Sequence, residues 1–480
     1  MYDAISTLLE VGVNSTAARL WLKLNQNTKI RIKTSAGVTD SAVVGDVIGQ
    51  GTAGAALVSQ LNLDHGLHTY FGGSKDEMYY GGVRCEYFAY QDDIGKPSAG
   101  VNEAQAGNVK LSQMFMDKGL EAHPDKTCFV VFGSSEFKGT ISKQLEDNPL
   151  YFGDFPVKRK DSEKYLGQII HSGGVRASCA ATITEREGKI NGAIFETKSI
   201  IEEFRMQAIG GIMAAWEIWE KAMVPSLLSG ASTWTGITST EIDRLDNIQD
   251  LFWRVMLRVP ESCPRIALRA ETKMIGMKHR VWQEKLLLVK RIKAQSKEAL
   301  SKKVFEEQKA NKWPGLSREV MDICEAVNLP DINDNEISAG FIKKAVLDHH
   351  YDELVDKISN SKKMKSHKDD NFREVQGYMK GKSVENCRLA FRIRCEMVED
   401  IRGNYKDKHR RKGGETAVLC QECSAEEIET QAHCLQCPRW ESIRAGLELN
   451  KIEDLVIFFQ KLMKERMKDK TGSQGAAQVS

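Results

Sequence analysis

Two adjacent carboxylates, Asp92 and Asp93, follow the aromatic, strand-forming run Tyr-Phe-Ala-Tyr at residues 87–90. Neighbouring aspartates repel each other, so this placement after an apolar strand adds little to folding stability. A divalent cation removes the repulsion, because hard ions such as Mg²⁺ take oxygen ligands and neutralise the local charge. The pair is therefore a candidate Mg²⁺ (or Mn²⁺) site, and the chemistry that it indicates is nucleotidyl transfer. The alternative is an ordinary acidic hairpin turn.

Three further segments surround this pair along the chain. The first lies about forty residues upstream, where glycines let the backbone approach a base pair closely because they carry no side chain. The second places Lys126 on a loop before a strand, where a lysine can protonate a leaving pyrophosphate; the alternative is a solvated surface lysine. In order, the segments are Gly49-Gln50-Gly51-Thr52, Leu120-Glu121-Ala122-His123-Pro124-Asp125-Lys126-Thr127 and Lys164-Tyr165-Leu166-Gly167.

In this order and at these intervals, the segments resemble the palm of a reverse transcriptase, an RNA-directed DNA polymerase, of the non-LTR (LINE-like) retrotransposon kind. The resemblance implies two-metal nucleotidyl transfer and extends to thumb-like helices near residues 227–234 and 246–260. It assigns catalytic roles to Asp92, Asp93 and Lys126, template and nucleotide positioning to Gly49, Gln50, Gly51, Thr52, Tyr90 and Gln91, and primer gripping to Lys164, Tyr165, Leu166 and Gly167.

The sequence departs from the family pattern at two of these positions. The family commonly has alanine in place of Gln91 and a basic residue in place of Gly49. The family also carries another metal-ligating aspartate on a strand upstream, followed by a helix. Asp3 stands at an expected helix start, where we expect it to cap the helix or to be solvated. The finger strands are not matched either, so we expect this chain to be a fragment of a longer reading frame and inactive as a polymerase by itself.

A cysteine and histidine cluster forms the second chemical signal. The pattern Cys420-x2-Cys423-x9-His433-x3-Cys437 supplies three thiolates and an imidazole, which fill a tetrahedral Zn²⁺ site without leaving an open position. Cys434 is an alternative ligand, although Cys437 leaves a better gap after the histidine. The segment resembles the C-terminal zinc knuckle of LINE-like elements, and a closed site of this kind is structural.

A basic segment precedes this cluster. It contains the cations Lys406, Lys408, Arg410, Arg411 and Lys412. A basic loop beside a zinc knuckle favours contact with a nucleic-acid backbone. The alternative is a solvated charged loop.

Composition limits the class of protein. The 480 residues are 41% hydrophobic and 28% charged, as in soluble globular proteins, and the net charge of +2 does not by itself indicate a nucleic-acid binder. No apolar stretch approaches the roughly 20 residues that span a bilayer, and no signal peptide is recognised. The eleven cysteines cluster only near residues 420–437, which favours a reducing compartment with one metal site.

Hydrophobic periodicity predicts the elements that must position these residues. The important one is a hairpin whose tip is Gln91-Asp92-Asp93, because its turn would present both carboxylates. The predicted elements are a helix over residues 1–23, a hairpin of Lys29–Thr39 with Ser41–Ile48, a helix from Ala53 to about Leu63, a hairpin over Glu77–Gly95, a helix over Ala104–Gly119, a strand over Cys128–Phe132 and a strand from Lys164 through Ile170.

We therefore expect an α+β fold: an incomplete polymerase palm, an antiparallel sheet with packed helices, followed by a mostly α-helical region and a small zinc knuckle. The expected domains are a partial palm over 1–177, a helical thumb-like region over 178–300, a charged helical linker over 301–380 and a C-terminal segment with the zinc knuckle over 381–480.

The resemblance also implies the partners: an RNA template, a DNA primer or target, and deoxynucleoside triphosphates, with no membrane. A eukaryotic retrotransposon protein of this kind is expected in the nucleus and cytoplasm. Two alternatives stay open. One is a nucleic-acid-binding protein without catalysis, and the other is a non-functional retrotransposon relic.

Overall fold

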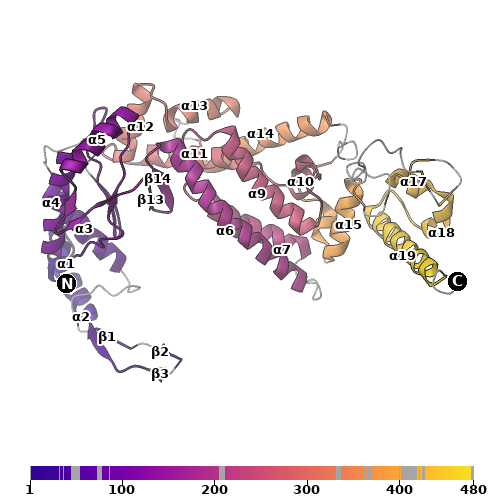
Figure 1. Cartoon of the computed structure of the whole chain (residues 1–480), viewed down its shortest axis with the longest axis horizontal. Helices are drawn as coiled ribbons and strands as arrows, with labels where there is room; N and C mark the ends of the chain where they lie inside the picture. The colour runs from indigo at the N-terminus through magenta and orange to yellow at the C-terminus, as the bar shows by residue number, and fades with distance from the viewer. Residues whose placement is uncertain are drawn as a thin grey trace. The chain divides into compact units, whose positions relative to one another are not determined.

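The fold belongs to the α+β class predicted from the sequence. Helices dominate, and the strands form two-stranded sheets that are antiparallel except for the pair β9–β12. The described residues group into two compact units, Met1–Cys179 with Gln295–Trp313, and Ala180–Ala294 with Pro314–Ser480. The computed structural model (Figure 1) describes residues 2–26, 28–31, 33–35, 37–44, 55–72, 78–85, 87–204, 211–330, 337–361, 364, 367, 370–381, 383–398, 401, 419, 420, 422, 423 and 427–476.

Within its described residues, the first unit combines helices with short hairpins. Its elements are α1 (Tyr2–Glu10), α2 (Ser15–Asn25), β1 (Thr28–Ile30), β2 (Lys33–Thr34), β3 (Gly37–Val38), β4 (Ala42–Val44), α3 (Ala55–Phe71), β5 (Met78–Tyr80), β6 (Val83–Cys85), β7 (Phe88–Tyr90), β8 (Asp93–Gly95), α4 (Val101–Lys118), β9 (Cys128–Phe129), α5 (Ser135–Asp147), β10 (Tyr151–Phe152), β11 (Phe155–Pro156), β12 (Lys158–Arg159), β13 (Ser162–Tyr165), β14 (Gln168–His171), the start of α6 (Val175–Phe204) and α12 (Leu300–Ala310).

The core of the first unit forms where α3 packs against α4. Leu67 and Met114 are fully buried between these helices, and Phe152 from β10 closes the cluster. The helices approach closely at Gly66, where an added Cβ would lie 3.1 Å from the Met114 sulfur. The predicted helix over Ala104–Gly119 is confirmed as α4, which ends at Gly119 because this residue takes the left-handed conformation.

The predicted helix over residues 1–23 is two helices. Gly12 takes φ +88° between α1 and α2, and the Asn14 side chain caps α2 by accepting a hydrogen bond from Thr16 N. Glycine tolerates this backbone conformation because it has no Cβ. Asp3 lies in α1. The prediction of one continuous helix over residues 1–23 was therefore wrong, because the chain turns between α1 and α2.

Two predicted hairpins are subdivided in the structure. β1 pairs with β4 as expected, but the segment between them folds into a smaller hairpin, β2–β3. The single hairpin predicted over Glu77–Gly95 is two consecutive hairpins, β5–β6 and β7–β8. The strand predicted over Cys128–Phe132 is shorter, since only β9 pairs, and its partner is the parallel strand β12.

Helix α12 joins the first unit although it follows the long helical region in sequence. Trp313, just beyond α12, packs edge-on against Tyr80 with ring centroids 5.2 Å apart. Gln308 donates a hydrogen bond to the Tyr80 hydroxyl, and Glu307 accepts one from Gly82 N at 3.1 Å. The beginning of the segment predicted as a linker therefore packs on the β5–β6 hairpin.

The second unit is helical. In chain order it contains most of α6, then α7 (Gly211–Ile218), the π-helical turn η2 (Trp219–Met223), α8 (Val224–Leu227), the 3-10 turn η3 (Ala231–Thr233), α9 (Ser239–Leu257), α10 (Arg265–Thr272), α11 (Met277–Ala294), α13 (Leu316–Ala326), α14 (Ala339–Ser359), η5 (Gly377–Lys380), α15 (Val384–Arg394), α17 (Gln431–Gln436), η6 (Pro438–Trp440), α18 (Glu441–Arg444) and α19 (Ile452–Ala476).

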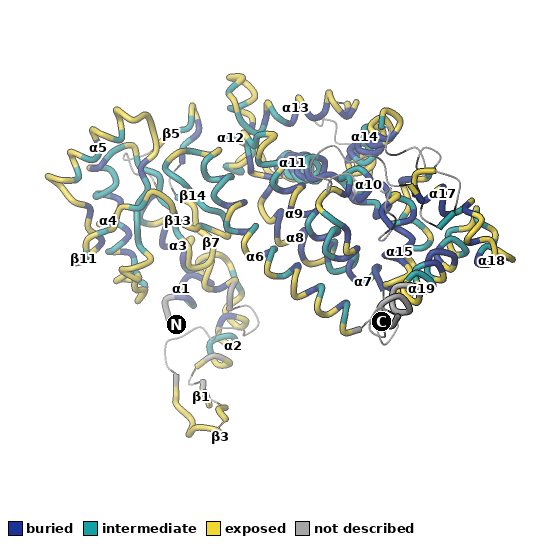
Figure 2. Tube along the Cα trace, turned by 45° about the vertical axis from the view of Figure 1, so that its right-hand side comes forward, coloured by how far each residue is buried: buried dark blue, intermediate teal, exposed yellow. Residues whose placement is uncertain are grey.

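Helix α9 anchors the core of the second unit. Its N-terminus carries a capping box between Thr238 and Glu241. Its buried Phe252 packs against Trp219 and also contacts the ring of the buried Trp253. Figure 2 shows the resulting burial along α9 in dark blue. This helix lies in the region 178–300 that the sequence predicted to be helical. Among the helices that the structure describes, none has the length and apolarity that crossing a bilayer requires.

Candidate functional site

The carboxylate pair stands at an exposed hairpin tip. β7 and β8 pair from Phe88↔Gly95 to Tyr90↔Asp93, which leaves Gln91 and Asp92 as the two turn residues. Gln91 has φ +55°. Two-residue hairpin turns require a positive φ at this position, because the resulting backbone twist matches that of the flanking strands. Tyr90, Gln91 and both aspartates are exposed. The sequence therefore predicted the presentation of these carboxylates correctly.

A second hairpin lies against the first. β13 pairs with β14 from Ser162↔His171 to Tyr165↔Gln168, and the turn residues Leu166 and Gly167 have φ +48° and +75°. The strand predicted from Lys164 through Ile170 is thus wrong, because the chain reverses at these two residues. Glycine adopts a positive φ without strain, whereas a positive φ at leucine costs about 1 kcal/mol or more in backbone strain.

Tyr165 connects the two hairpins. Its hydroxyl donates a hydrogen bond to the Phe88 carbonyl oxygen at 3.3 Å, and its ring lies 3.9 Å from the position that a Cβ on Gly95 would take. Burial raises the pKa of Tyr165, and the negative charge of Asp93 raises it further. The Lys164–Gly167 segment and the Asp92–Asp93 turn therefore belong to one local structure.

Lys126 lies in the exposed turn that follows α4, where its backbone N–H bonds to the His123 carbonyl at 3.1 Å. The adjacent Asp125 pairs with Lys158 at 2.7 Å, and this hydrogen-bonded lysine lowers the pKa of Asp125. No contact of Lys126 with Asp92 or Asp93 occurs among the described residues. The structure leaves the predicted proton-donor role without geometric support.

Two sets of predicted site residues lie outside the described residues. One is the template- and nucleotide-positioning segment Gly49, Gln50, Gly51 and Thr52, and the other is the basic segment with Lys406, Lys408, Arg410, Arg411 and Lys412.

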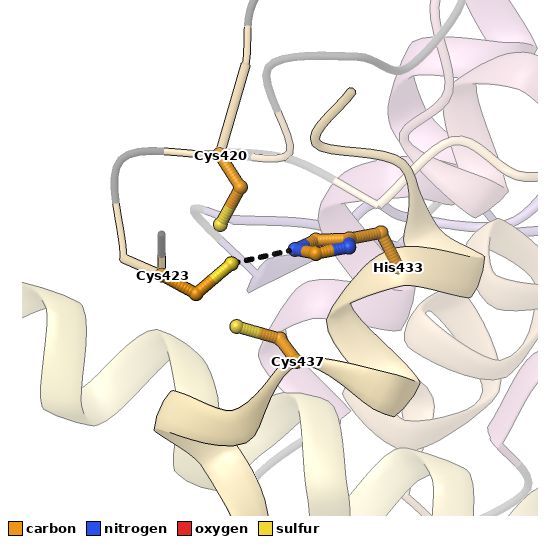
Figure 3. A group of neighbouring side chains, drawn as sticks. All are labelled: Cys420, Cys423, His433 and Cys437. Carbon is orange, nitrogen blue, oxygen red and sulfur yellow. Dashed lines mark hydrogen bonds between the residues drawn. The ribbon is translucent and has the colours of Figure 1, made fainter. Parts of the chain in front are cut away.

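The four predicted zinc ligands come together. Three sulfurs and an imidazole point toward one another (Figure 3), with one ligand atom of each within 4.8 Å of every other. Cys423 Sγ lies 3.5 Å from His433 Nε2. Tetrahedral Zn²⁺ with ordinary Zn–S and Zn–N bonds separates such atoms by about 3.6 Å. The set Cys420, Cys423, His433 and Cys437 could therefore hold a metal ion such as zinc.

Local structure fixes the histidine of this Cys3His centre. His433 lies in the first turn of α17, whose N-terminus is capped by Thr430 accepting a hydrogen bond from His433 N at 3.0 Å. The Glu427 carboxylate lies 2.6 Å from His433 Nδ1, so Nε2 faces the sulfurs. A carboxylate behind a histidine in this way orients the ring for a metal. Burial lowers the pKa of His433, but the bonds to Glu427 and Cys423 outweigh it and leave the pKa raised.

Electrostatics favour a cation in the centre. Burial raises the pKa of Cys420, and it raises that of Cys437 to about 11. Several buried thiolates without a counter-charge are unfavourable, and a divalent metal reverses this by stabilising the deprotonated sulfurs. The donor set and its burial both fit Zn²⁺.

The choice between Cys434 and Cys437 is settled by packing. Cys434 is fully buried among apolar side chains of the C-terminal core, including Phe458 and Phe459, and burial raises its pKa to about 12. It does not belong to the four-residue cluster, whereas Cys437 does. The three-residue gap predicted from the sequence therefore selects the cysteine that joins the cluster in the structure.

The Cys3His centre is built into the C-terminal core. Arg466 of α19 pairs with the buried Glu429 at 2.8 Å, and Gln431 donates a hydrogen bond to the Ile393 carbonyl of α15 at 2.7 Å. Arg444 bonds to the Cys437 carbonyl at 2.6 Å. Sequence reasoning missed these supports. The one signal in the sequence for the carboxylate that orients His433 was the presence of an acidic residue, Glu427, six positions before it.

No protein-family model matches this chain, and a search of curated proteins found no match. The assignment of function therefore depends on the residues and their geometry.

Proposed function

We propose that this chain carries part of the reverse transcriptase of a non-LTR, LINE-like retrotransposon. The reaction of the complete enzyme is Mg²⁺-dependent extension of a DNA primer on an RNA template with deoxynucleoside triphosphates. The observation that carries the proposal is the pair of hairpins, in which an exposed Asp92–Asp93 turn is contacted through Tyr165 by the Lys164–Gly167 turn.

The chemistry of the donors supports a catalytic cation at the first hairpin. Asp92 and Asp93 are exposed and offer carboxylate oxygens, the ligands that Mg²⁺ and Mn²⁺ prefer. A bound ion would neutralise charge on the reacting phosphate oxygens. The turn at Leu166 and Gly167 would hold the primer end beside the carboxylates, since Tyr165 joins the two hairpins.

The remaining roles follow the motif order. Gly49–Thr52, with Tyr90 and Gln91, would position template and nucleotide, and Lys126 would protonate the leaving pyrophosphate. The Cys3His centre would hold Zn²⁺ as a structural ion. The basic segment 406–412 precedes this centre in the sequence and would contact nucleic-acid backbone. Such an element protein would act in the nucleus and cytoplasm.

A second candidate is a nucleic-acid-binding protein without catalysis. The closed Cys3His centre favours it, because the centre needs no intact polymerase site to fold. Strongly salt-dependent RNA binding that is lost on Cys420→Ser with Cys423→Ser would support this candidate. Weak binding that is indifferent to these substitutions would support a non-functional relic.

Primer–template binding tests the proposal. We expect the chain to bind an RNA–DNA primer–template more tightly in Mg²⁺ than in EDTA, and Asp92→Asn with Asp93→Asn to remove this difference, as measured by fluorescence anisotropy. Asp154→Asn is the matched control, since Asp154 is also an exposed acid in a hairpin turn, between β10 and β11. Mg²⁺-dependent binding that survives the double substitution would contradict the assigned roles.

Primer extension tests the expectation about activity. The further palm aspartate of the family is not matched within these 480 residues, so we expect no template-dependent synthesis with Mg²⁺ or Mn²⁺. Synthesis that Asp92→Ala abolishes would overturn the expected inactivity and would still support the polymerase assignment.

A further inference from the structure

Two histidines and a glutamate from two helices meet in the second unit. His279 lies on α11, and His349 and Glu353 lie one turn apart on α14, which packs against α11. The His279 side chain is only 3% exposed, whereas those of His349 and Glu353 are 25% and 30% exposed. The cluster is thus buried at one end and accessible to solvent at the other.

The ligand atoms of this His279–His349–Glu353 cluster lie close together, with each histidine nearest to a different oxygen of the Glu353 carboxylate. His279 Nε2 lies 3.0 Å from His349 Nδ1 and 4.0 Å from Glu353 Oε2, and His349 Nδ1 lies 3.8 Å from Glu353 Oε1. Tetrahedral Zn²⁺ separates two such ligand atoms by about 3.3 Å. Each of these distances is within about 1 Å of that value, so small side-chain movements would complete the ligand geometry.

The protonation states suit a metal. Burial lowers the pKa of His279 to about 2, and the nearby His350 and Lys278 lower it as well, so the ring is neutral at ordinary pH. Burial raises the pKa of Glu353, but the hydrogen bond and charge of Lys278, together with the charges of His279 and Lys357, outweigh burial and lower the pKa to about 2. Neutral imidazoles and a carboxylate are the forms that bind metals.

One nitrogen of the cluster has no partner in the described part of the chain. His279 Nδ1 is buried and makes no hydrogen bond there. A buried polar atom left in this way costs about 1–3 kcal/mol, and a metal on His279 Nε2 would leave Nδ1 without a partner as well, so the geometry of the facing nitrogens carries the argument. On metal binding, the ring protons would move to His279 Nδ1 and to the half-exposed ring of His349, leaving the facing nitrogens as ligands.

Two lysines contact the carboxylate of the cluster. Lys278 bonds Glu353 Oε1 at 2.6 Å and Lys357 lies 3.3 Å from Oε2, so a metal would share Glu353 with one lysine and displace the other. Trp282 covers the rings, with centroids 5.4 Å from His279 and 5.6 Å from His349. Lysines on a ligating carboxylate can orient it, as outer groups do in metal sites.

A comparable cluster elsewhere in the second unit is already filled. Glu271, His367 and Asp370 also lie together, but Arg394 Nε lies 2.6 Å from Glu271 and also bonds Asp370, and Tyr378 donates a hydrogen bond to Glu271 at 2.6 Å. The permanent charge of arginine occupies the place of a metal there.

We propose that His279, His349 and Glu353 form a second metal site, which takes a borderline divalent ion such as Zn²⁺ and joins α11 to α14. Imidazole and carboxylate ligands suit ions of this class. With three protein ligands, the half-exposed side keeps a coordination position for water.

Co²⁺ titration of the metal-free full chain separates the two sites. Co²⁺ bound by the Cys3His centre gives a thiolate-to-metal charge-transfer band, and Co²⁺ bound by nitrogen and oxygen ligands does not. We expect one equivalent of each kind. His349→Ala and Glu353→Gln should each weaken only the thiolate-free equivalent by at least about 10-fold. His123→Ala, which removes an exposed histidine of the first unit, should leave both unchanged.

Both substitutions lie at half-exposed positions, and Glu353→Gln keeps the size of the side chain, so circular dichroism should show a folded chain in at least this variant. Zn²⁺ should compete for the same equivalent and raise the unfolding temperature of the wild type. Binding of only the thiolate-bound equivalent by the wild type, or a thiolate-free equivalent that survives both substitutions, would overturn the proposal.

Discussion

The two buried cysteines at the end of the C-terminal core provide a matched pair for a decisive substitution. Cys434 and Cys437 are 0% and 1% exposed and lie three residues apart, but only Cys437 points at the other Cys3His ligands. Substitution of either cysteine by serine removes one buried sulfur atom and replaces it with an oxygen. The two variants therefore differ mainly in whether a metal ligand is lost.

The structure sets the magnitudes. Zinc-finger peptides bind Zn²⁺ with about 10–16 kcal/mol, so one of four ligands contributes roughly 2.5–4 kcal/mol, and Cys437→Ser should weaken Zn²⁺ binding about 60- to 700-fold. Cys434→Ser places a hydroxyl in an apolar core and should lower the free energy of unfolding by about 1–3 kcal/mol without changing zinc stoichiometry.

Competition with a chromophoric chelator measures the zinc affinity, and urea unfolding followed by circular dichroism measures stability. A Cys434→Ser variant that loses zinc while Cys437→Ser retains it would refute the ligand assignment. Equal loss in both variants would show that the centre fails through unfolding and not through the missing ligand.

Three other perturbations have expected outcomes. Glu427→Gln should weaken Zn²⁺ binding about 10- to 100-fold in the same competition, because the imidazole loses its orienting carboxylate; unchanged affinity would exclude that role. Gly167→Ala should lower the free energy of unfolding by about 1 kcal/mol since φ is +75°, whereas Gly188→Ala, in α6 with open space around its Cβ, should raise it by roughly 0.5–1 kcal/mol. Effects of equal sign in urea unfolding would contradict the turn geometry. Burial and Arg269 lower the pKa of His350 to about 4. The free energy of unfolding contains the full contribution of neutral His350 above about pH 6.5. This free energy should fall by roughly 3 kcal/mol between pH 6.5 and pH 4, because the histidine binds a proton more readily in the unfolded chain. A His350→Gln variant with the same pH dependence in urea unfolding would contradict this.

Local patterns predicted the Cys3His ligands well. Cys420, Cys423, His433 and Cys437 lie close together in the sequence, so they need little tertiary information to meet. The Asp92–Asp93 hairpin was predictable for the same reason, because an aromatic run followed by polar turn residues determines it locally.

Tertiary packing produced what the sequence did not reveal. The four-residue spacing of His349 and Glu353 places them on one helix face, but no local signal pairs that face with His279, which lies seventy positions earlier. The reversal at Leu166 was missed because leucine rarely takes positive φ, and only the adjacent Gly167 indicated a turn.

Affinity cleavage tests the central claim most directly. With Fe²⁺ in place of Mg²⁺ and peroxide added, radicals form at the bound ion and cut nearby backbone. We expect cuts in β7–β8 and in β13–β14, since Tyr165 joins these hairpins, and we expect Asp92→Asn with Asp93→Asn to remove them while Asp154→Asn does not. Cuts that avoid both hairpins, or that persist in the double variant, would contradict a catalytic metal site at Asp92 and Asp93.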